Sequence, residues 1–433
     1  MTYNPELITI NTSHIEQPSP MSGIWENRLA AYKLYDGPGI PKCSIVVPAY
    51  NRVEKTKYCV ECILKYTDGV SYELILIDNG SDDGTLEFFK SVEYNPKKII
   101  HITKNIGAGY AWRVARDNFS GKYLVIVSND VYVTKNWLSN LIKCYESDPR
   151  VGFVSPVSSA VSNYQQVNLE YQNFDEMQDK AETHNQSDPS KWDERLRLIS
   201  LIGIYSRHVL DIVGISDPAF IHDFLEDDLA IRLRRGGYKL VLCRDTWVCH
   251  DHSYETMEAV ERFKWNQIVG YGHAAYMEKY NGLNPWDDTT NFEFQLLDPI
   301  STMEFPDGKL KALTIDCRCG TPVLEVKNHL HRRGLIDLDN YAYTTKPQYY
   351  TDLQYIADTQ CDSIDKILGH YKENTFDIIA LCEPLDTYTS FVSILHNLIF
   401  ILKTGGILLY KLNLEGSIKN IRLIKQKEGT IEN

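Results

Sequence analysis

The stretch Ser44–Asn51, which reads SIVVPAYN, decides the expected fold of the first part of the chain. Three further short apolar runs follow it, at Glu73–Ile77, Ile99–Ile102 and Tyr123–Val127. Helical patterns come after the four runs, near Val53–Tyr66, Asp82–Ser91, Ala108–Asn118 and Thr134–Tyr145. Strands of about five apolar residues that alternate with helices of about a dozen are typical of a parallel sheet. We therefore predict the α/β class.

Polar residues follow each of the four predicted strands. The four polar segments are Ala49-Tyr50-Asn51-Arg52, Asp78-Asn79-Gly80-Ser81, Lys104-Asn105-Ile106-Gly107 and Ser128-Asn129-Asp130. In open α/β sheets the ligand binds beyond the carboxyl ends of the strands. The sequence thus predicts a binding site at this edge of the sheet.

Composition excludes several classes of protein. A length of 433 residues predicts two or three domains, at about 150 residues each. Lys plus Arg number 45 against 58 Asp plus Glu, which gives a formal charge of −13. Such an acidic chain does not suit a general binder of nucleic acid or of anionic membranes. A phosphorylated ligand would need positive charge supplied locally, by a metal, a helix N-terminus or a few placed Lys and Arg.

The cysteines and the apolar runs indicate a protein of the cytoplasm. Ten cysteines are too sparse for a disulfide scaffold, and no second pair at zinc-finger spacing accompanies Cys59 and Cys62. The N-terminus has no basic segment followed by an apolar one, so no signal peptide is expected. The apolar run Phe391–Leu402 is far shorter than the about 20 residues that span a bilayer. We predict it to be a buried core helix and predict no transmembrane segment.

The chain divides into five predicted parts. They are an N-terminal arm (1–42), a first α/β domain (43–283), a linker (284–308), a second α/β domain (309–415) and a loose, Lys-rich tail (416–433). The second domain is predicted from strands at Lys311–Ile315, Phe376–Leu381 and Ile407–Leu412 and helices at Val323–Arg333 and Thr389–Leu402.

Residues from Ser44 to about Tyr280 resemble family 2 glycosyltransferases of the GT-A fold, especially the branch that transfers rhamnose and related sugars. The first strand and its end, Ile45–Asn51, match the family's opening motif. The resemblance implies that the strand end, made of Pro48, Ala49, Tyr50 and Asn51, cradles the nucleotide base. It also implies a pyrimidine nucleotide sugar, UDP- or dTDP-linked, as the donor.

Two further motifs extend the nucleotide site. Asp78 and Asn79 stand in the family's turn after the second strand, where the Asp78 carboxylate can accept the N3–H of uracil or thymine. Asp82 is interpreted as the N-cap of the next helix. Lys104, Asn105 and Gly107 resemble the family's Asn-x-Gly loop, whose small residues let backbone N–H groups approach a phosphate. Asn129, beyond the fourth strand, completes the implied donor site.

The expected metal site departs from the family pattern. Ser128-Asn129-Asp130 occupies the place of the Asp-x-Asp motif, and Ser128 replaces its first carboxylate. Asp130 together with the donor diphosphate could still hold Mn²⁺ or Mg²⁺. His250 and His252 resemble the family's terminal His motif, and their spacing on a strand puts both rings on one face. One of them completing the metal shell is one interpretation, and a pair of structural histidines is the alternative.

The catalytic base is expected in the acidic cluster Glu226-Asp227-Asp228, which resembles the family's Glu-Asp-x-Asp helix but is one residue shorter. Acids in a first helical turn also stabilise the helix dipole without any catalytic role. Asp228 lies four residues before Arg232, the spacing of a helical ion pair. That leaves Asp227, which the family pattern favours, with Glu226 as the alternative.

The second domain resembles a degenerate class I methyltransferase. The segment Leu313–Thr321 matches that family's first strand and glycine loop, and later strands match as well. Arg318 and Pro322 stand where glycine is usual, and only Gly320 is kept. We therefore expect no S-adenosylmethionine binding and a role in docking, including a homodimer formed through this domain.

Together these features predict a metal-dependent glycosyltransferase that acts on the hydroxyl of a glycan or other acceptor, and the family resemblance implies inversion at the anomeric carbon. One alternative is a bifunctional glycosyltransferase and methyltransferase. Another is a non-catalytic sugar-binding scaffold, for which Ser128 is the only support.

Overall fold

The four predicted strands form a parallel sheet in the computed structural model, which describes residues 39–251, 259–426 and 431–432. These strands are β1 (Cys43–Ala49), β2 (Tyr72–Asn79), β3 (Lys97–Ile102) and β4 (Tyr123–Val127). β1 lies between β2 and β4, and β3 lies outside β2, all in parallel register. The side chains of β1, β2 and β4 are almost all buried, as expected for strands covered on both faces. The α/β class is confirmed.

The helices between these strands lie close to their predicted positions. They are α2 (Val53–Tyr66), α3 (Thr85–Ser91), α4 (Ala108–Asn118) and α5 (Trp137–Tyr145). The prediction that Asp82 caps α3 is wrong. Gly84 is the N-cap residue, in a left-handed conformation, and Asp83 accepts the backbone N–H of Thr85. The backbone N–H of Asp82 instead donates to the Asn51 side chain, which ties the loops after β1 and β2 together.

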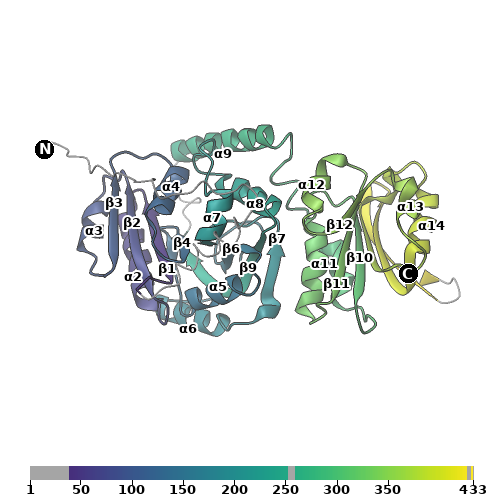
Figure 1. Cartoon of the computed structure of the whole chain (residues 1–433), viewed down its shortest axis with the longest axis horizontal. Coiled ribbons are helices and arrows are strands. Elements are labelled where there is room, and N and C mark those ends of the chain that lie inside the picture. Colours follow the sequence, from purple (N-terminus) through teal and green to yellow (C-terminus); the bar gives the residue numbers. More distant parts are fainter. Residues whose placement is uncertain (1–38, 252–258, 427–430, 433) are drawn as a thin grey trace, which may run out of the picture. The chain divides into compact units, whose positions relative to one another are not determined.

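The first sheet continues beyond β4 in mixed orientation (Figure 1). Its strand order is β3-β2-β1-β4-β8-β6-β9-β5, with β7 paired to β9. The further strands are β5 (Val131–Tyr132), β6 (Val151–Ser158), β7 (Trp192–Arg195), β8 (Ile202–Ser206) and β9 (Lys239–His250). The further helices are α6 (Phe174–His184), α7 (Arg207–Val213), α8 (Leu225–Arg235) and α9 (Ala259–Lys279).

The second sheet has the order β12-β11-β10-β13-β14-β15-β16. Its strands are β10 (Leu310–Ile315), β11 (Leu338–Thr344), β12 (Asp358–Cys361), β13 (Phe376–Pro384), β14 (Leu402–Leu414), β15 (Ser417–Lys425) and β16 (Ile431–Glu432). Its helices are α10 (Phe294–Leu297), α11 (Thr321–Arg332), α12 (Tyr350–Leu353), α13 (Ile367–His370) and α14 (Phe391–Ile401).

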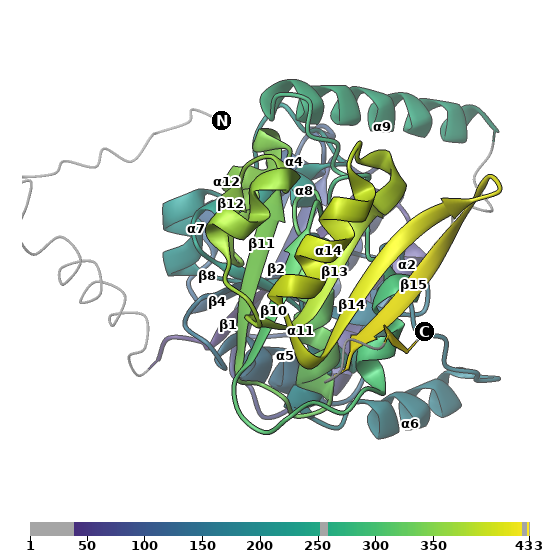
Figure 2. The same cartoon turned by 90° about the vertical axis from the view of Figure 1, so that its right-hand side faces the viewer.

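Residues 417–425 differ from the loose tail that the sequence predicts. They form β15, which pairs antiparallel with β14 over eight residue pairs (Figure 2). Glu415 and Gly416 connect the two strands, and both have positive φ angles, of 51° and 79°. Two central residues with positive φ match the right-handed twist of paired strands in a tight hairpin. Leu423 is buried, so this hairpin also contributes to the core.

Helix α14 is only half buried, contrary to the prediction of a core helix. Ile394, Leu398 and Ile401 pack on the second sheet. Phe391, Val392 and Phe400 are 44%, 54% and 44% exposed. The sheet covers one face of the helix, because helices pack on a sheet from one side, and the apolar residues of the opposite face meet solvent.

Contacts between β7 and α11 join the two sheets within one compact unit, residues 41–433. The side chain of Asn328 accepts the backbone N–H of Glu194 and donates to its carbonyl, at 3.0 Å each. The Arg332 guanidinium binds both carboxylate oxygens of Asp193, which is fully buried. Asn328 thus pairs with the outer edge of β7 as a neighbouring strand would.

Candidate active site

The residues predicted to bind the nucleotide meet at the carboxyl ends of three adjacent strands. Ala49 of β1 lies in register with Asp78 of β2, which lies in register with His101 of β3. Tyr50 follows Ala49 and is half exposed, at 49%. Pro48 is partly buried and Ala49 is buried, so their backbone forms the floor of this edge.

Asn51 organises the loop after β1. Its backbone N–H donates to the Ser81 hydroxyl at 2.9 Å, and its side-chain oxygen accepts the Asp82 N–H at 3.0 Å. Its φ angle of 55° lies in the left-handed region, which Asn tolerates better than most residues. Asn51 therefore holds the β1 and β2 loops against each other.

Asn79 joins the β2 loop to the predicted phosphate loop. Its amide nitrogen lies 3.3 Å from both the Asn105 side-chain oxygen and the Gly107 carbonyl, and its oxygen accepts the Ile106 N–H. Gly80 is required here, because a Cβ at this position would lie 2.5 Å from the Asn105 nitrogen. Lys104 follows β3 on the same edge and is exposed. This loop leads directly into the first turn of α4.

Asp78 is deeply buried and is covered by a residue that the sequence reasoning missed. It is fully buried, and its Oδ1 accepts the Ser81 N–H at 2.9 Å. Its Oδ2 lies 2.7 Å from Nδ1 of His101, whose side chain is 42% exposed. His101 lies opposite Asp78 in the register of β2 and β3, a pairing that the sheet sets and that no local sequence pattern shows.

Asp130 and His250, two of the three predicted metal ligands, lie together. Nε2 of His250 is 3.5 Å from Asp130 Oδ1, and the Arg52 guanidinium is 3.7 Å from Oδ2. Burial favours a raised pKa for the Asp130 carboxyl, but the hydrogen bond and charge of His250, with Arg52, leave that pKa below its ordinary value. His250 is held from behind by the Ala160 carbonyl, 2.6 Å from its Nδ1.

The third predicted ligand, His252, lies outside the described residues. Within residues 39–251 and 259–426, no group of three or more His, Cys, Asp or Glu side chains forms a metal cage. One carboxylate and one imidazole nitrogen suit Mn²⁺, which takes oxygen and nitrogen ligands, if the diphosphate of a donor supplies the remaining oxygens. The amide of Asn129, which is predicted to bind the donor, donates to the Thr56 hydroxyl at 2.9 Å and ties the loop after β4 to α2.

The acidic cluster at the start of α8 separates into three environments. Asp228 is fully buried and accepts a hydrogen bond from Arg232 Nε at 2.8 Å, which confirms the predicted helical ion pair. The Tyr280 hydroxyl and the Lys279 ammonium bind its other oxygen. Asp228 therefore anchors α8 to the end of α9.

Asp227 is also held in an ion pair. The Arg197 guanidinium binds both of its carboxylate oxygens, Nε to Oδ1 and Nη2 to Oδ2 at 3.3 Å. Asp227 is 4% exposed and the Arg197 side chain 10%, so the pair is screened from water. A two-point, buried pair of this kind fixes the carboxylate in place.

Glu226 is the member of the cluster with the strongly altered acidity. Part of the residue is exposed, but its carboxyl is crowded by protein atoms; this loss of solvent, followed by the negative charge of Asp227, raises the pKa of the carboxyl to about 7. A carboxyl with a pKa near neutrality can exchange a proton at physiological pH, which is the property of a general base.

His222 lies beside the acidic cluster and was also missed from the sequence. Its side chain is half exposed but crowded by protein atoms, which by itself lowers the pKa of the imidazole. The hydrogen bond and charge of Asp223 and the charges of Glu226 and Asp130 outweigh this and leave that pKa above its ordinary value. Its ring meets the Trp265 ring edge-on at 4.6 Å. His222 is therefore within electrostatic reach of both Glu226 and Asp130.

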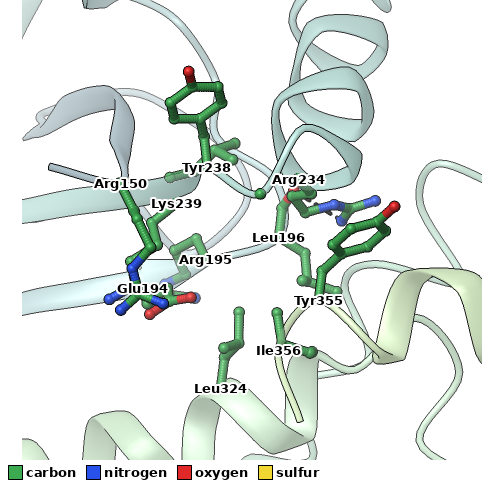
Figure 3. Close-up of a pocket in the computed structure, with 12 residues that line it drawn as sticks. Arg150, Glu194, Arg195, Leu196, Arg234, Tyr238, Lys239, Leu324, Tyr355 and Ile356 are labelled. Atoms are coloured by element: carbon green, nitrogen blue, oxygen red, sulfur yellow. Dashed lines mark hydrogen bonds between the residues drawn. The ribbon is translucent and has the colours of Figure 1, made fainter. Parts of the chain in front are cut away.

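A small cavity elsewhere does not belong to this site. It has a volume of about 20 Å³ and is lined by Arg195, Leu196 and Arg234 on one side and by Leu324, Tyr355 and Ile356 on the other (Figure 3). That volume has room for about one water molecule and is far too small for a nucleotide sugar. None of the predicted site residues lines it.

The first part of the chain is similar to known proteins. A family model described as "Glycosyl transferase family 2" matches residues 44–193. The glycosyltransferase YfnE of Bacillus subtilis, whose own function is uncharacterized, is 22% identical over 57% of this chain and 72% of that protein. The glycosyltransferase GlyG of Streptococcus pneumoniae is 34% identical over 23% of this chain and 33% of its own length.

Among solved structures, a mannosyltransferase from Pyrobaculum calidifontis in complex with GDP-Man and Mn²⁺ has a TM-score of 0.38 at 17% identity, over 76% of this chain and 82% of its own. GalNAc-T7 with UDP, GalNAc and Mn²⁺ has a TM-score of 0.43 at 12% identity, over 79% of this chain and 60% of its own. No helix among the described residues is long and apolar enough to cross a membrane. The matched residues, 44–193, carry β1 to β4 and the polar loops that follow them; the chain thus has a glycosyltransferase family 2 domain and is a transferase enzyme.

Proposed function

We propose that this enzyme transfers a sugar from a pyrimidine nucleotide sugar, UDP- or dTDP-linked, to the hydroxyl of a glycan or other acceptor, with inversion at the anomeric carbon. The observation that carries the proposal is the raised pKa of the Glu226 carboxyl. Glu226 and Asp130 both lie close enough to His222 for their charges to raise the pKa of its imidazole. A proton acceptor and a diphosphate-binding pair in one site are the two groups that such a transfer needs.

The proposed reaction is a direct displacement. The acceptor oxygen attacks the anomeric carbon from the face opposite the nucleotide, and the bond from that carbon to the diphosphate oxygen breaks. The acceptor proton passes to the Glu226 carboxylate, and the electron pair of the broken bond leaves with the nucleotide diphosphate. Single-step attack from the opposite face gives inversion.

Glu226 is favoured over Asp227 as the base because Arg197 occupies both oxygens of Asp227. A base must offer a free lone pair to the acceptor hydroxyl, and a carboxylate in a two-point pair with a guanidinium offers it poorly. Asp227 then acts as a positioning residue. Its negative charge helps to raise the pKa of Glu226 toward neutrality.

Asp130 and His250 are the proposed protein ligands of Mn²⁺ or Mg²⁺, with His252 as a further candidate. When bound, such an ion offsets the charge that develops on the departing diphosphate. Arg52, near Asp130, and the exposed Lys104 bring positive charge to the same edge of the sheet.

A decisive experiment measures donor turnover by the full chain against a panel of nucleotide sugars, with Mn²⁺, with Mg²⁺ and with EDTA. We expect turnover with at least one UDP- or dTDP-sugar, and its loss with EDTA. A panel without any donor binding, measured by thermal shift, would favour the scaffold alternative.

The second domain is proposed to have no methyltransferase activity. The loop that resembles a cofactor loop is occupied by the chain's own connector: the Cys319 N–H donates to the Asp288 carbonyl and the Thr321 hydroxyl to the Thr289 carbonyl. Arg318, which replaces a glycine, donates to the Asp287 carbonyl at 2.6 Å. One backbone donor and two side-chain donors of this loop thus already bind the connector.

We also propose a homodimer through the exposed face of α14, and a cytoplasmic location. Helix α14 has no charged residue, so two copies can meet there without the repulsion expected between chains of net charge −13. All ten cysteines are free thiols, which suits a reducing compartment.

A further inference from the structure

Asp78 and His101 form a pair in which the carboxylate is buried and the imidazole is partly exposed. Asp78 has no exposed surface, and both of its carboxylate oxygens already have partners, Ser81 and His101. The His101 side chain is 42% exposed. A ligand at this edge of the sheet can therefore touch the imidazole of His101 but not the carboxylate beneath it.

The carboxylate fixes which nitrogen of His101 carries the hydrogen. An ionised carboxylate only accepts hydrogen bonds, so at 2.7 Å the Nδ1 of His101 must be the donor. In the neutral ring the hydrogen is then absent from Nε2, which keeps a free lone pair. Asp78 thus orients the ring and leaves Nε2 as a hydrogen-bond acceptor.

The place of His101 puts this acceptor among the donor-binding loops. His101 lies in register with Asp78, and Asp78 with Ala49, so the histidine is two strands away from the exposed Tyr50. Lys104 and Asn105 follow it at the same carboxyl edge, where ligands of α/β sheets bind.

We propose that Nε2 of His101 reads the nucleotide base, by accepting the ring N–H on its Watson–Crick edge. Uracil and thymine present this donor at N3, and guanine presents it at N1. Cytosine N3 and adenine N1 are acceptors instead, so their lone pairs would face the lone pair of His101 Nε2 and repel it. The inference rests on the proposed function and deepens it: His101 determines base specificity and Asp78 is its positioning residue.

The key variant is His101→Asn. Its amide nitrogen can replace Nδ1 as the donor to Asp78, while the shorter side chain has no counterpart of Nε2. His370→Asn is the matched control, because His370 also contacts a carboxylate, Asp362 at 3.4 Å, but belongs to the second sheet's domain. Thermal unfolding of both variants shows whether the fold is kept.

The experiment is calorimetric titration of the full chain with UDP, dTDP, GDP, CDP and N3-methyl-UDP in the presence of Mn²⁺. We expect the unchanged protein and His370→Asn to bind UDP about tenfold more tightly than N3-methyl-UDP or CDP. His101→Asn should bind UDP about tenfold more weakly and should no longer distinguish UDP from N3-methyl-UDP. The titrations with dTDP and GDP show which of the bases that carry a ring N–H donor the site accepts.

The role of Asp78 is tested by the ratio of the dissociation constants for N3-methyl-UDP and UDP, rather than by the affinity for UDP alone. In Asp78→Asn the single side-chain oxygen still accepts the Ser81 N–H, so the amide nitrogen faces Nδ1 of His101 and moves the ring hydrogen to Nε2; this variant should therefore lose the preference for UDP over N3-methyl-UDP. Asp78→Ala frees the ring and should lose it as well.

Two outcomes would overturn the inference in distinguishable ways. If N3-methylation weakens binding equally in the unchanged protein and in His101→Asn, the histidine does not read the base, although the protein still binds nucleotide. If the unchanged protein binds none of the nucleotides, the proposed function itself fails.

Discussion

At the scale of single residues, the pKa of Glu226 makes the reaction pH-dependent. The base must be ionised to accept a proton, and its pKa of about 7 means that the protonated form predominates below neutrality. We therefore expect the turnover rate to fall about tenfold per pH unit below pH 7 and to level off above it. A pH–rate profile of sugar transfer at saturating donor checks this, and a rate independent of pH from 5 to 8 would contradict it.

Neutralising Glu226 should reduce the rate of sugar transfer, whereas neutralising Asp227 should mainly reduce the stability of the fold. Glu226→Gln should reduce transfer about 10²–10⁴-fold and leave donor affinity unchanged, because it removes only the proton acceptor. Asp227→Asn removes one partner of a buried ion pair and should lower the free energy of unfolding by about 1–3 kcal/mol. Transfer assays and denaturant titrations of both variants test this. A stable, inactive Asp227→Asn beside an active Glu226→Gln would assign the base to Asp227.

The same carboxyl should make the fold less stable at alkaline pH. In the unfolded chain the pKa of Glu226 returns to about 4.5, so between pH 4.5 and 7 the folded state binds more protons and its stability falls as pH rises. Glu226→Gln cannot ionise. It should raise the free energy of unfolding by about 1–2 kcal/mol at pH 8, after allowance for its partial exposure, and by nothing at pH 4. Melting temperatures at both pH values measure this, and an equal gain at both would contradict it.

At the scale of elements, the contact between α11 and β7 depends on one amide. Asn328 makes two hydrogen bonds to the Glu194 backbone. Asn328→Ala should destabilise the protein by about 1–3 kcal/mol, because it leaves the partly buried N–H and C=O of Glu194 without these partners. The neighbouring control Lys327→Ala loses only an ion pair of Lys327, itself 37% exposed, with Glu194 and should cost less than about 1 kcal/mol. Equal losses in denaturant titrations would argue against edge pairing.

The cofactor-like loop before α11 should be inert. Its backbone and side-chain donors bind the connector at Asp287, Asp288 and Thr289. We expect no heat in a calorimetric titration with S-adenosylmethionine. Binding of S-adenosylmethionine with a dissociation constant in the micromolar range would instead favour the alternative of a bifunctional glycosyltransferase and methyltransferase.

At the scale of the whole molecule, α14 should control the oligomeric state. Val392 is 54% exposed on a helix without charged residues. Val392→Glu would place two like charges in a symmetric interface and should convert a dimer to a monomer in light scattering. Ile336→Glu is the control, because Ile336 is 75% exposed and lies outside α14. A chain that is monomeric before substitution would remove the dimer proposal.

Local sequence patterns were enough to predict the α/β class, four strands within three residues at each end, and the position of Asn51, Asp78, Lys104 and Asp130 at one edge of the sheet. These follow from local signals, because apolar runs of five residues and the polar residues after them need no distant contact to be recognised. The Asp228–Arg232 pair was predictable for the same reason, since both residues share one helix.

Long-range contacts were needed to show which acid of the cluster has the altered pKa and which residue covers Asp78. Arg197 lies 30 positions before Asp227 and His101 lies 23 positions after Asp78, so neither pairing appears in a local pattern. The hairpin partner of β14 and the exposed face of α14 depend in the same way on long-range packing. Spacing along the chain fixes which elements form, whereas the ionisation of a carboxyl depends on the charges and the burial that folding brings to it.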